Sequence, residues 1–467
     1  MPRVWAHQVR PTVINACAGL LLLMPLVILA SLPAILNGFP ILYDDSNVYV
    51  GFSKTLGAPY PPFYSAAVWA IGLIDLRAVI AVQAMIVVLM LAFAITRFTP
   101  ASTPVIALAV AVLLVLTQLP WLTSWLTPDL LGGLGGLAVM LLTLPPKPAH
   151  PWASAVLLAV VAFACIAATA SLLMLLPFAL FCVAVRRLVA GSPDLDRAAW
   201  ALLALLPLCA AISIAANYVI SDNATLAKGS SARLFSKLAD NRLAQPYLAE
   251  HCATDRIPAC AHLSELESFD EAEQFLWGKD GAPSLARRLD AWDDRSGEYA
   301  HLSRRIILAY PGEAGHIAWR DTVILLRGLT FEKQSRELIP LAAPEGSVRG
   351  RIATRHPKML PAFLDARQQQ DTLRAIYPDR FYILSTLASY ILLPLVLAVA
   401  LIRRDRLLAP ICIATLALLL GSAAVHGSLS SPVPRYNIKV SWLPWWAVTV
   451  ALLRWPHGRC ARPPGGR

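Results

Sequence analysis

Charge is scarce in this chain of 467 residues: Asp, Glu, Lys and Arg together make up 15%, whereas hydrophobic residues make up 57%. A soluble globular protein carries roughly 25% charged residues. The mean hydropathy of +0.58 therefore excludes that class and favours an integral membrane protein. The net charge of +11 does not indicate a nucleic-acid partner, because Lys and Arg lie in short segments between apolar runs, as in cytoplasmic loops of membrane proteins.

Several motifs of well-known enzymes are also missing. The chain has no Gly-rich nucleotide-binding loop, Walker motif, His-Glu-x-x-His, Cys-x-x-Cys or Gly-x-Ser-x-Gly. No series of ionisable residues runs through the apolar segments, as is usual in ion-coupled transporters, and no paired Gly/Pro interruptions indicate inverted repeats. These absences disfavour soluble-nucleotide chemistry and ion-coupled transport.

About ten apolar runs approach the roughly 20 residues that a helix needs to cross a bilayer. The first follows Arg3 and Arg10 as a signal peptide would, but it is too long for one and lacks a convincing cleavage site, so we expect a retained helix. The runs span residues 12–36, 78–97, 103–119, 128–145, 152–168, 170–185, 198–219, 381–402, 408–425 and 438–453.

The fifth and sixth runs meet at a weak turn at residues 167–169. A single helix over 152–185 would be about 50 Å long at 1.5 Å per residue, well beyond a hydrocarbon core of about 30 Å. The flanking charges, Lys147 on one side and Arg186-Arg187 on the other, are both positive, which requires an even number of crossings between them. We therefore predict two helices.

The distribution of positive charge predicts the orientation. The positive-inside rule places both termini in the cytoplasm. Residues 38–77, 119–128, 220–380 and 426–437 then lie outside. The basic residues assigned to the cytoplasmic side are those of the N-terminus, Arg97, Lys147, Arg186, Arg187, Arg197, Arg403, Arg404, Arg406 and the tail with Arg454, Arg459, Arg462 and Arg467.

The segment 220–380 differs in kind from the rest of the chain. It carries charges of both signs, and stretches such as 264–277 and 303–310 favour short amphipathic helices without an alternating strand pattern. We predict an all-α integral membrane protein with a mainly helical extracytoplasmic domain inserted between helices 7 and 8. The membrane part is then divided into 1–219, with helices 1–7, and 381–467, with helices 8–10 and a basic tail.

Two of the eight cysteines stand apart. Six lie in apolar runs or in the basic tail, where a thiol is usually a small buried hydrophobe. Cys252 and Cys260 instead share one polar segment and close a short loop around a proline. In an oxidising compartment we expect a disulfide between them, the alternative being two unrelated thiols.

Adjacent carboxylates, Asp44 and Asp45, follow the first predicted helix in the outer loop 38–77. Neighbouring carboxylates repel, so one can hold its proton more tightly while the other accepts a proton or binds a hydroxyl. The simpler alternative is a helix N-cap with a solvated neighbour. Lys54 is the main positive charge of this loop and a further candidate for substrate binding.

The last outer loop, 426–437, begins with His426 and ends near Arg435 and Tyr436, and Lys439 follows one turn later. Arg offers a planar donor fork suited to phosphate, Lys a second cation, and Tyr an amphipathic ring at headgroup depth. All four side chains are candidates for substrate binding. The alternative is an interfacial belt of Arg and Trp that touches ordinary lipid phosphates.

Asp129 follows Pro128 at the start of the fourth predicted helix. Pro in the first turn and Asp near a helix N-terminus are what capping predicts, so this residue alone is a weak signal. Its position matters more, because the predicted topology places it on the same face of the membrane as Asp44, Asp45 and Arg435.

Together these elements resemble motifs of the GT-C superfamily of polytopic glycosyltransferases, which includes the protein O-mannosyltransferases and the aminoarabinose transferases of lipid A. There an acidic pair follows the first helix, as Asp44-Asp45 does here. A Pro-Asp element opens a later helix, as at Pro128-Asp129, and an Arg-Tyr element precedes a late helix, as at Arg435-Tyr436. The layout is also similar to that of bacterial membrane proteins with a two-cysteine outer domain and a C-terminal Arg-Tyr loop.

The resemblance implies that the membrane is a bacterial inner (plasma) membrane. It also implies transfer of a sugar, typically with inversion, from a polyprenyl-phosphate donor to an envelope glycan, lipid or protein. The donor phosphate would lie near Arg435 and Lys439, and Asp44 or Asp45 would act as general base. Asp129 would bind the acceptor or orient a divalent cation; no metal ligands and no other cofactor are implied, and membrane lipids are the remaining partner. The resemblance does not cover the large outer insertion, which in several members follows the final helix instead.

Two non-enzymatic interpretations stay open. A translocase for a lipid-linked glycan would place polar residues deep inside the bundle. An assembly protein with an outer domain that binds an envelope partner would tolerate substitution of Asp44, Asp45 and Arg435. Convergence of these side chains with Tyr436 on one face would favour the transferase.

Overall fold

The computed structural model describes residues 23–455 except for short breaks. Every regular element of the described residues is a helix, and the one strand-like pairing in them is an isolated parallel bridge between Ile41 and Trp125. The predicted all-α fold class is thereby confirmed. The breaks are residues 52–61, 146–149, 189–194, 223, 228, 256, 270–271, 279–283, 293–294, 332–337 and 344–346.

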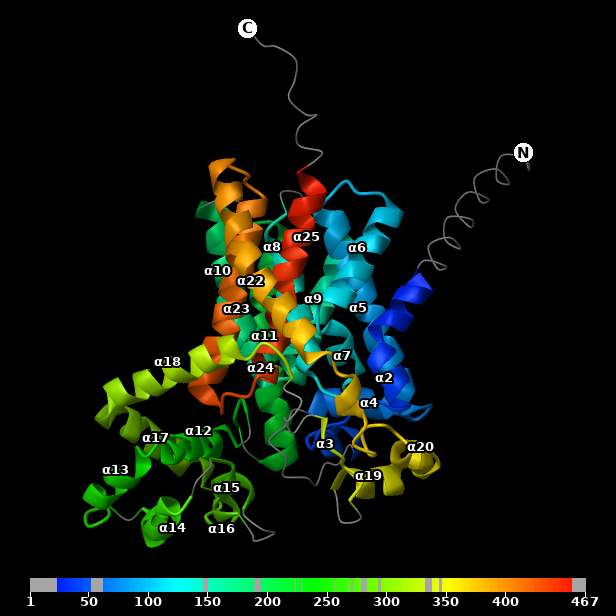
Figure 1. Cartoon of the computed structure of the whole chain (residues 1–467). Coiled ribbons are helices and arrows are strands. Elements are labelled where there is room, and N and C mark those ends of the chain that lie inside the picture. The colour runs from blue at the N-terminus through cyan, green and yellow to red at the C-terminus, as the bar shows by residue number, and fades with distance from the viewer. Residues whose placement is uncertain are drawn as a thin grey trace, which may run out of the picture.

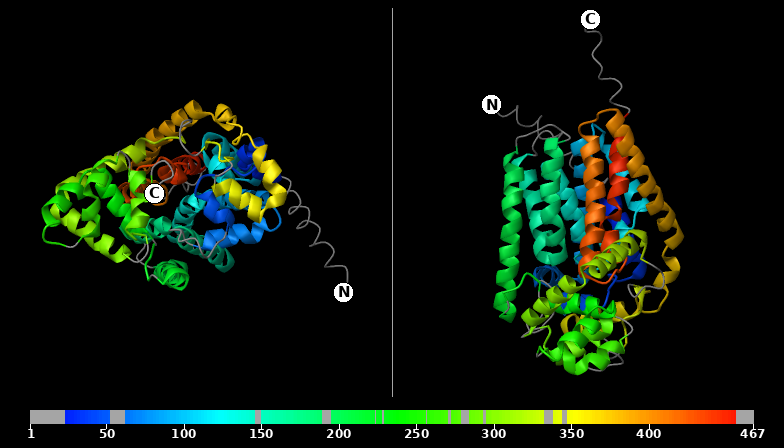
Figure 2. Two further views of the ribbon diagram at one scale, coloured as in Figure 1. Left: turned by 90° about the horizontal axis from the view of Figure 1, so that it is seen from below. Right: turned by 90° about the vertical axis from the view of Figure 1, so that its left-hand side faces the viewer.

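Apolar helices form an upright bundle, as expected of a membrane protein (Figures 1 and 2). The five that are long and apolar enough to cross a bilayer are α5 (Leu76–Phe98), α10 (Thr169–Leu188), α11 (Arg197–Ser221), α22 (Asp379–Ile402) and α23 (Leu408–Leu429). Shorter helices in the same bundle are α6 (Thr103–Leu116), α8 (Asp129–Thr143), α9 (Pro151–Ala167) and α25 (Leu443–Arg454).

These five long helices are fewer than the ten crossings predicted from hydropathy. The first predicted run lies partly outside the described residues, and its described end is helical. Other runs form helices of only 14, 15 and 17 residues in α6, α8 and α9. The last run is split into α24 (Arg435–Ser441) and the 12-residue α25, with Trp442 between them.

The apolar stretch that contains the fifth and sixth runs divides at Ala168, whose backbone is extended. At the far end of α10, Arg186 donates a hydrogen bond to the carbonyl oxygen of Thr143, the last residue of α8. Since α9 starts shortly after α8 ends, α9 and α10 run in opposite directions. This is the pair of helices that the length of the segment predicts.

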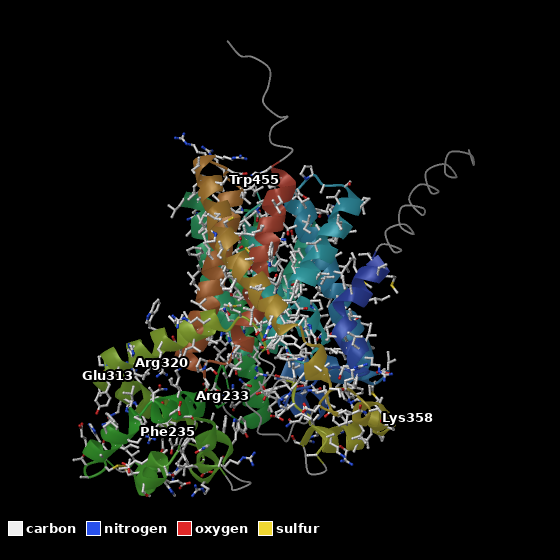
Figure 3. All side chains as sticks on the ribbon, in the orientation of Figure 1. Arg233, Phe235, Glu313, Arg320, Lys358 and Trp455 are labelled. Atoms are coloured by element: carbon white, nitrogen blue, oxygen red, sulfur yellow. A yellow bond between two sulfur atoms is a disulfide. The ribbon has the colours of Figure 1, made fainter. Side chains whose placement is uncertain are left out.

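The two ends of the bundle carry different side chains. At one end Arg454 donates to the carbonyl oxygen of Phe98 and lies 3.7 Å from Asp405, while Arg403 lies over the ring of Trp455, which Figure 3 labels. At the opposite end lie the short helices and the insertion between α11 and α22 (Figure 1). We call this the loop end; its short helices are α2 (Leu32–Asn37), α3 (Ser46–Gly51), α4 (Pro62–Gly72), α7 (Leu119–Ser124) and α24.

The insertion has two structurally different parts. The first has its own hydrophobic core, in which Phe235 packs against Phe275 and Tyr299. It comprises α12 (Ser230–Asp240), α13 (Ala244–His251), η1 (Pro258–His262), α14 (Leu263–Glu267), α15 (Ala272–Trp277), α16 (Leu285–Arg288), α17 (Ser296–Ala309) and α18 (Pro311–Arg327).

The second part has no core of its own. Its buried residues, among them Phe363 and Tyr377, belong to the core of the helical bundle. The part therefore covers the bundle instead of standing apart from it. It comprises α19 (Ser347–Arg355), η3 (Pro357–Met359), α20 (Leu360–Leu364) and α21 (Leu373–Ile376).

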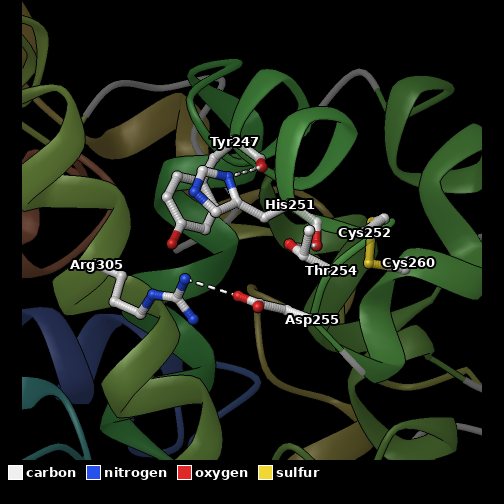
Figure 4. The surroundings of a disulfide bond; sticks show 7 residues. All are labelled: Tyr247, His251, Cys252, Thr254, Asp255, Cys260 and Arg305. Carbon is white, nitrogen blue, oxygen red and sulfur yellow. Dashed lines mark hydrogen bonds and ion pairs between the residues drawn. A yellow bond between two sulfur atoms is a disulfide. The ribbon is translucent and has the colours of Figure 1, made fainter.

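A disulfide joins Cys252 to Cys260 in the first part of the insertion (Figure 4). Beside it, Arg305 of α17 donates to Asp255 over 2.7 Å and also lies over the ring of Tyr247. The disulfide loop is thus attached to α17 by a partly exposed ion pair.

Glycine allows α8 and α24 to approach closely. A Cβ at Gly133 would lie 2.1 Å from the carbonyl oxygen of Lys439 and 2.8 Å from Nε1 of Trp442, which itself donates to that carbonyl. The nearest obstacle is backbone, which cannot move aside as a flexible side chain can.

We predict that Gly133→Ala lowers the free energy of unfolding by about 1–3 kcal/mol through overpacking, measured by thermal unfolding in detergent. Gly421→Ala in α23 is the matched control, since a Cβ there meets open space. The control should keep or slightly raise stability, because Ala is the better helix former. A Gly133→Ala protein as stable as the wild type would contradict this packing.

Candidate functional site

An ion pair at the loop end joins the first predicted outer loop to the last. The Nη2 of Arg435, the first residue of α24, donates to Oδ2 of Asp45 over 2.9 Å. The guanidinium lies 4.1 Å from the ring centre of Tyr43 and 5.2 Å from that of Tyr436. Arg435 is only 6% exposed, so its charge is held among aromatic rings with a carboxylate partner.

The local sequence explains how both charges are positioned. Pro434 directly precedes α24, and proline suits the start of a helix because its fixed φ and missing N–H cost nothing there. In the other loop, the carbonyls of Asp44 and Asp45 accept from the backbone N–H groups of Asn47 and Val48 at the start of α3. The two aspartates therefore sit at a helix entrance, as the N-cap alternative expects, but Asp45 also binds Arg435.

A second buried pair lies close by. Nδ1 of His426 is 2.8 Å from the carbonyl oxygen of Ser422, which can only accept, so in the neutral ring this nitrogen carries the proton. Nε2 then accepts from Nζ of Lys439, 2.9 Å away. The His426 ring also stacks on Tyr436 with 4.9 Å between ring centres. Lys439 and His426 are 2% and 4% exposed.

Asp129 belongs to the same neighbourhood. Its charge acts on both Arg435 and Lys439. One turn further along α8, Gly132 leaves room for the Lys439 side chain, whose Cδ would lie 3.3 Å from a Cβ at that position. Asp129 is thus a second carboxylate near the two buried cations.

Hydrogen bonds fix the acidic loop to the start of α8. The backbone of Ile41 accepts from Leu126 and donates to Ser124. The buried hydroxyl of Ser46 donates to the carbonyl of Leu126 over 3.1 Å and accepts from the N–H of Tyr43. These contacts hold Asp45 and Asp129 in a fixed relation to each other.

Burial lowers the pKa of Arg435, but Tyr436, Asp45 and Asp129 outweigh this effect and hold the pKa well above its ordinary value. The guanidinium is therefore charged throughout the range in which proteins work. Its Nε makes no hydrogen bond to any described residue. Arg435 thus keeps donor capacity beyond its bond to Asp45.

The structure brings most of the predicted site residues into one group. Asp44 adjoins this group and is exposed. Lys54 lies outside the described residues, and the disulfide belongs to the separate core of the insertion. Within the described part of the chain, no three His, Cys, Asp or Glu side chains are grouped so as to hold a metal ion. The group, which we call the Arg435 cluster, consists of Tyr43, Asp45, Asp129, His426, Arg435, Tyr436 and Lys439.

A buried ion pair ties the insertion to the cluster. Nζ of Lys237 in α12 lies 2.5 Å from Oδ2 of Asp321 in α18 and donates to the carbonyls of Gly427 and Ser430 over 2.6 and 2.7 Å. Burial lowers the pKa of Lys237, and Asp321 opposes that effect. Because both carbonyls lie between His426 and Arg435 in sequence, the insertion helps to position the last outer loop.

Sequence reasoning missed Tyr43, Lys237 and Asp321. Tyr43 directly precedes the acidic pair, so its proximity to the site was readable from its neighbours. For the other two no local signal exists, because they are 84 residues apart and meet through packing.

No protein-family model, no curated protein and no solved structure matches this chain. The Arg435 cluster and the sequence motifs that contribute to it are therefore the features that indicate a function.

We predict that Asp321→Asn lowers the free energy of unfolding by about 3–5 kcal/mol, because it leaves the buried charge of Lys237 without a carboxylate. Lys237→Met should cost less, because Asp321 keeps its ion pair with Arg320. The double variant should lose less than the sum of the single losses, since the two residues interact. Thermal unfolding in detergent measures all three.

Arg305→Gln is the matched control, because it breaks an ion pair whose side chains are 36% and 31% exposed and should leave the melting temperature nearly unchanged. Additive losses in the double variant would contradict a coupled pair.

Proposed function

We propose that this chain is a membrane glycosyltransferase that moves a sugar from a polyprenyl-phosphate donor to an acceptor of the bacterial cell envelope. The observation that carries the proposal is the ion pair between Asp45 and Arg435, which are 390 positions apart and meet at the loop end of an apolar bundle. A carboxylate able to accept a proton and a guanidinium able to bind phosphate are the two groups that this transfer requires.

In this proposal the loop end faces the extracytoplasmic side of the inner membrane and both termini face the cytoplasm. Two features support this orientation. The opposite end of the bundle carries Arg186, Arg403 and Arg454, in agreement with the positive-inside rule. The insertion at the loop end contains a disulfide, which persists in oxidising compartments.

The donor phosphate would compete with Asp45 for Arg435. A guanidinium binds phosphate in the same forked geometry as carboxylate, and its Nε has no partner among the described residues. Arrival of the donor would therefore release Asp45 from its ion pair. Lys439, held against neutral His426, would add a second positive charge behind the phosphate.

The released carboxylate of Asp45 would then serve as general base. It takes the proton of the acceptor hydroxyl as the acceptor oxygen attacks the anomeric carbon. The bond from that carbon to the phosphate oxygen breaks, and polyprenyl phosphate leaves with the electron pair. Attack opposite the leaving group inverts the anomeric centre. Asp44 and Asp129 would bind acceptor hydroxyls or a divalent cation at the edge of the site.

Asp45 is both the ion-pair partner of Arg435 and the proposed general base. Asp45→Asn should therefore reduce transfer by about 100-fold or more, the scale of a lost general base. Arg435→Lys should weaken donor binding, because Lys lacks the planar fork. The measurement is mass analysis of envelope glycans and lipid-linked sugars in cells producing each variant at equal levels, with Asp44→Asn alongside.

Asp371→Asn is the matched control: its side chain is 59% exposed and paired with Arg374 in the covering part of the insertion. Its glycan profile should equal that of the wild type. Profiles that stay unchanged in the Asp44, Asp45 and Arg435 variants and in the deletion strain would rule out a transferase and leave the translocase or assembly interpretation.

A further inference from the structure

Helix α18 has one face built into the protein and another that no described residue covers. The buried face presents Ile317, Asp321, Thr322 and Leu325 and packs against α23. On the exposed side Trp319 is 66% exposed and Val323, one turn further along the same stripe, is partly exposed. Ile324 is 41% exposed but lies about 140° away from Trp319 around the helix axis. Leu308, at the end of the preceding helix α17, is 68% exposed.

The position of α18 relative to the bundle fixes its depth. The backbone nitrogen of Thr322 would lie 2.6 Å from a Cβ at Gly427, two residues before α23 ends. Figures 1 and 2 show α18 running across α23 at this level and projecting beyond the bundle; Figure 3 labels Glu313 near its projecting end. A helix that crosses a membrane span at its end lies at the level of the lipid headgroups.

We propose that α18 lies in the headgroup region of the bilayer at the loop end, with Trp319 and Val323 turned toward the lipids. The neighbouring span α23, on which α18 packs, exposes the apolar side chains of Leu420 and Leu429. A bilayer that surrounds α23 therefore also meets α18. Tryptophan is enriched at this depth, because its ring is amphipathic.

The charges of α18 fit a phospholipid surface. Of its acidic residues, Asp321 is buried in the ion pair with Lys237 and Glu313 lies in the first turn. Arg320 and Arg327 are exposed cations, and Arg320 also pairs with Asp321. A helix with an apolar face flanked by cations is typical of segments that lie flat on a membrane surface.

The placement of α18 does not depend on the reaction proposed for the Arg435 cluster. It nevertheless connects the membrane surface to that cluster. Thr322 packs on Gly427, and Asp321 binds Lys237, which donates to the carbonyls of Gly427 and Ser430. The lipid-contacting helix is therefore attached directly to the loop that ends at Arg435, so the bilayer surface itself helps to set the position of that loop.

The test replaces Trp319 by the photoreactive p-benzoylphenylalanine in full-length protein reconstituted into vesicles of phosphatidylethanolamine and phosphatidylglycerol. Irradiation should produce a phospholipid adduct on the peptide that contains position 319, identified by mass spectrometry. Val323 receives the same replacement in a second variant, so the result does not depend on one position.

The matched control carries p-benzoylphenylalanine in place of His301, an exposed residue of α17 in the groove beside the disulfide loop. No lipid adduct should form at that position. A cross-link from positions 319 and 323 to a second copy of the chain would overturn the proposal in favour of a protein contact. Absence of lipid adducts at both positions would overturn it in favour of a water-facing surface.

Discussion

The ion pair between Asp45 and Arg435 is the interaction on which the loop end depends. It joins the turn before α3 to the first residue of α24 across almost the whole chain. Arg435 is nearly fully buried, and a buried guanidinium without a counter-charge would be strongly destabilising. The folded bundle therefore requires the acidic first loop and the basic last loop to meet, and the remaining cluster residues follow from that contact.

The insertion is attached to the rest of the protein in two ways. Lys237 is buried between Asp321 and the carbonyls of Gly427, in the last turn of α23, and of Ser430, directly after it, so the part with its own core is fixed to the cluster through charge. The covering part is fixed through the bundle core and through Gln368, whose amide exchanges hydrogen bonds with the backbone of Leu42. The insertion therefore holds both chain segments that meet in the Arg435 cluster.

The sequence was sufficient for features that depend on local pattern. Hydropathy predicts the all-α class, and helix length places the break near Ala168. The number of spanning helices was harder to predict, because α24 and α25 are separate helices although the apolar run is continuous. Hydropathy records how apolar a segment is and not where its backbone changes direction.

The local sequence pattern does not predict which distant charged residues pair with each other. Asp45 and Arg435 were both identified as candidates, but as base and phosphate ligand separately, and nothing in their neighbours shows that they bind each other. In the sequence, Lys237 is indistinguishable from a solvated lysine of an amphipathic helix. Only the packing of the folded chain brings Asp321 to it. Pairing between distant charges is decided by tertiary structure, which a single sequence does not display.

Charge balance in the cluster limits the chemistry that it can perform. Two buried cations, Arg435 and Lys439, are near two carboxylates, Asp45 and Asp129, and the neutral tautomer of His426 accepts from Lys439. An additional phosphate would leave the buried group with excess negative charge if every existing pair stayed intact. In the proposed transfer, the donor phosphate would take the place of Asp45 on Arg435. The displaced carboxylate would then carry the excess negative charge until it accepts the proton of the acceptor hydroxyl, so charge balance would favour Asp45 as the base.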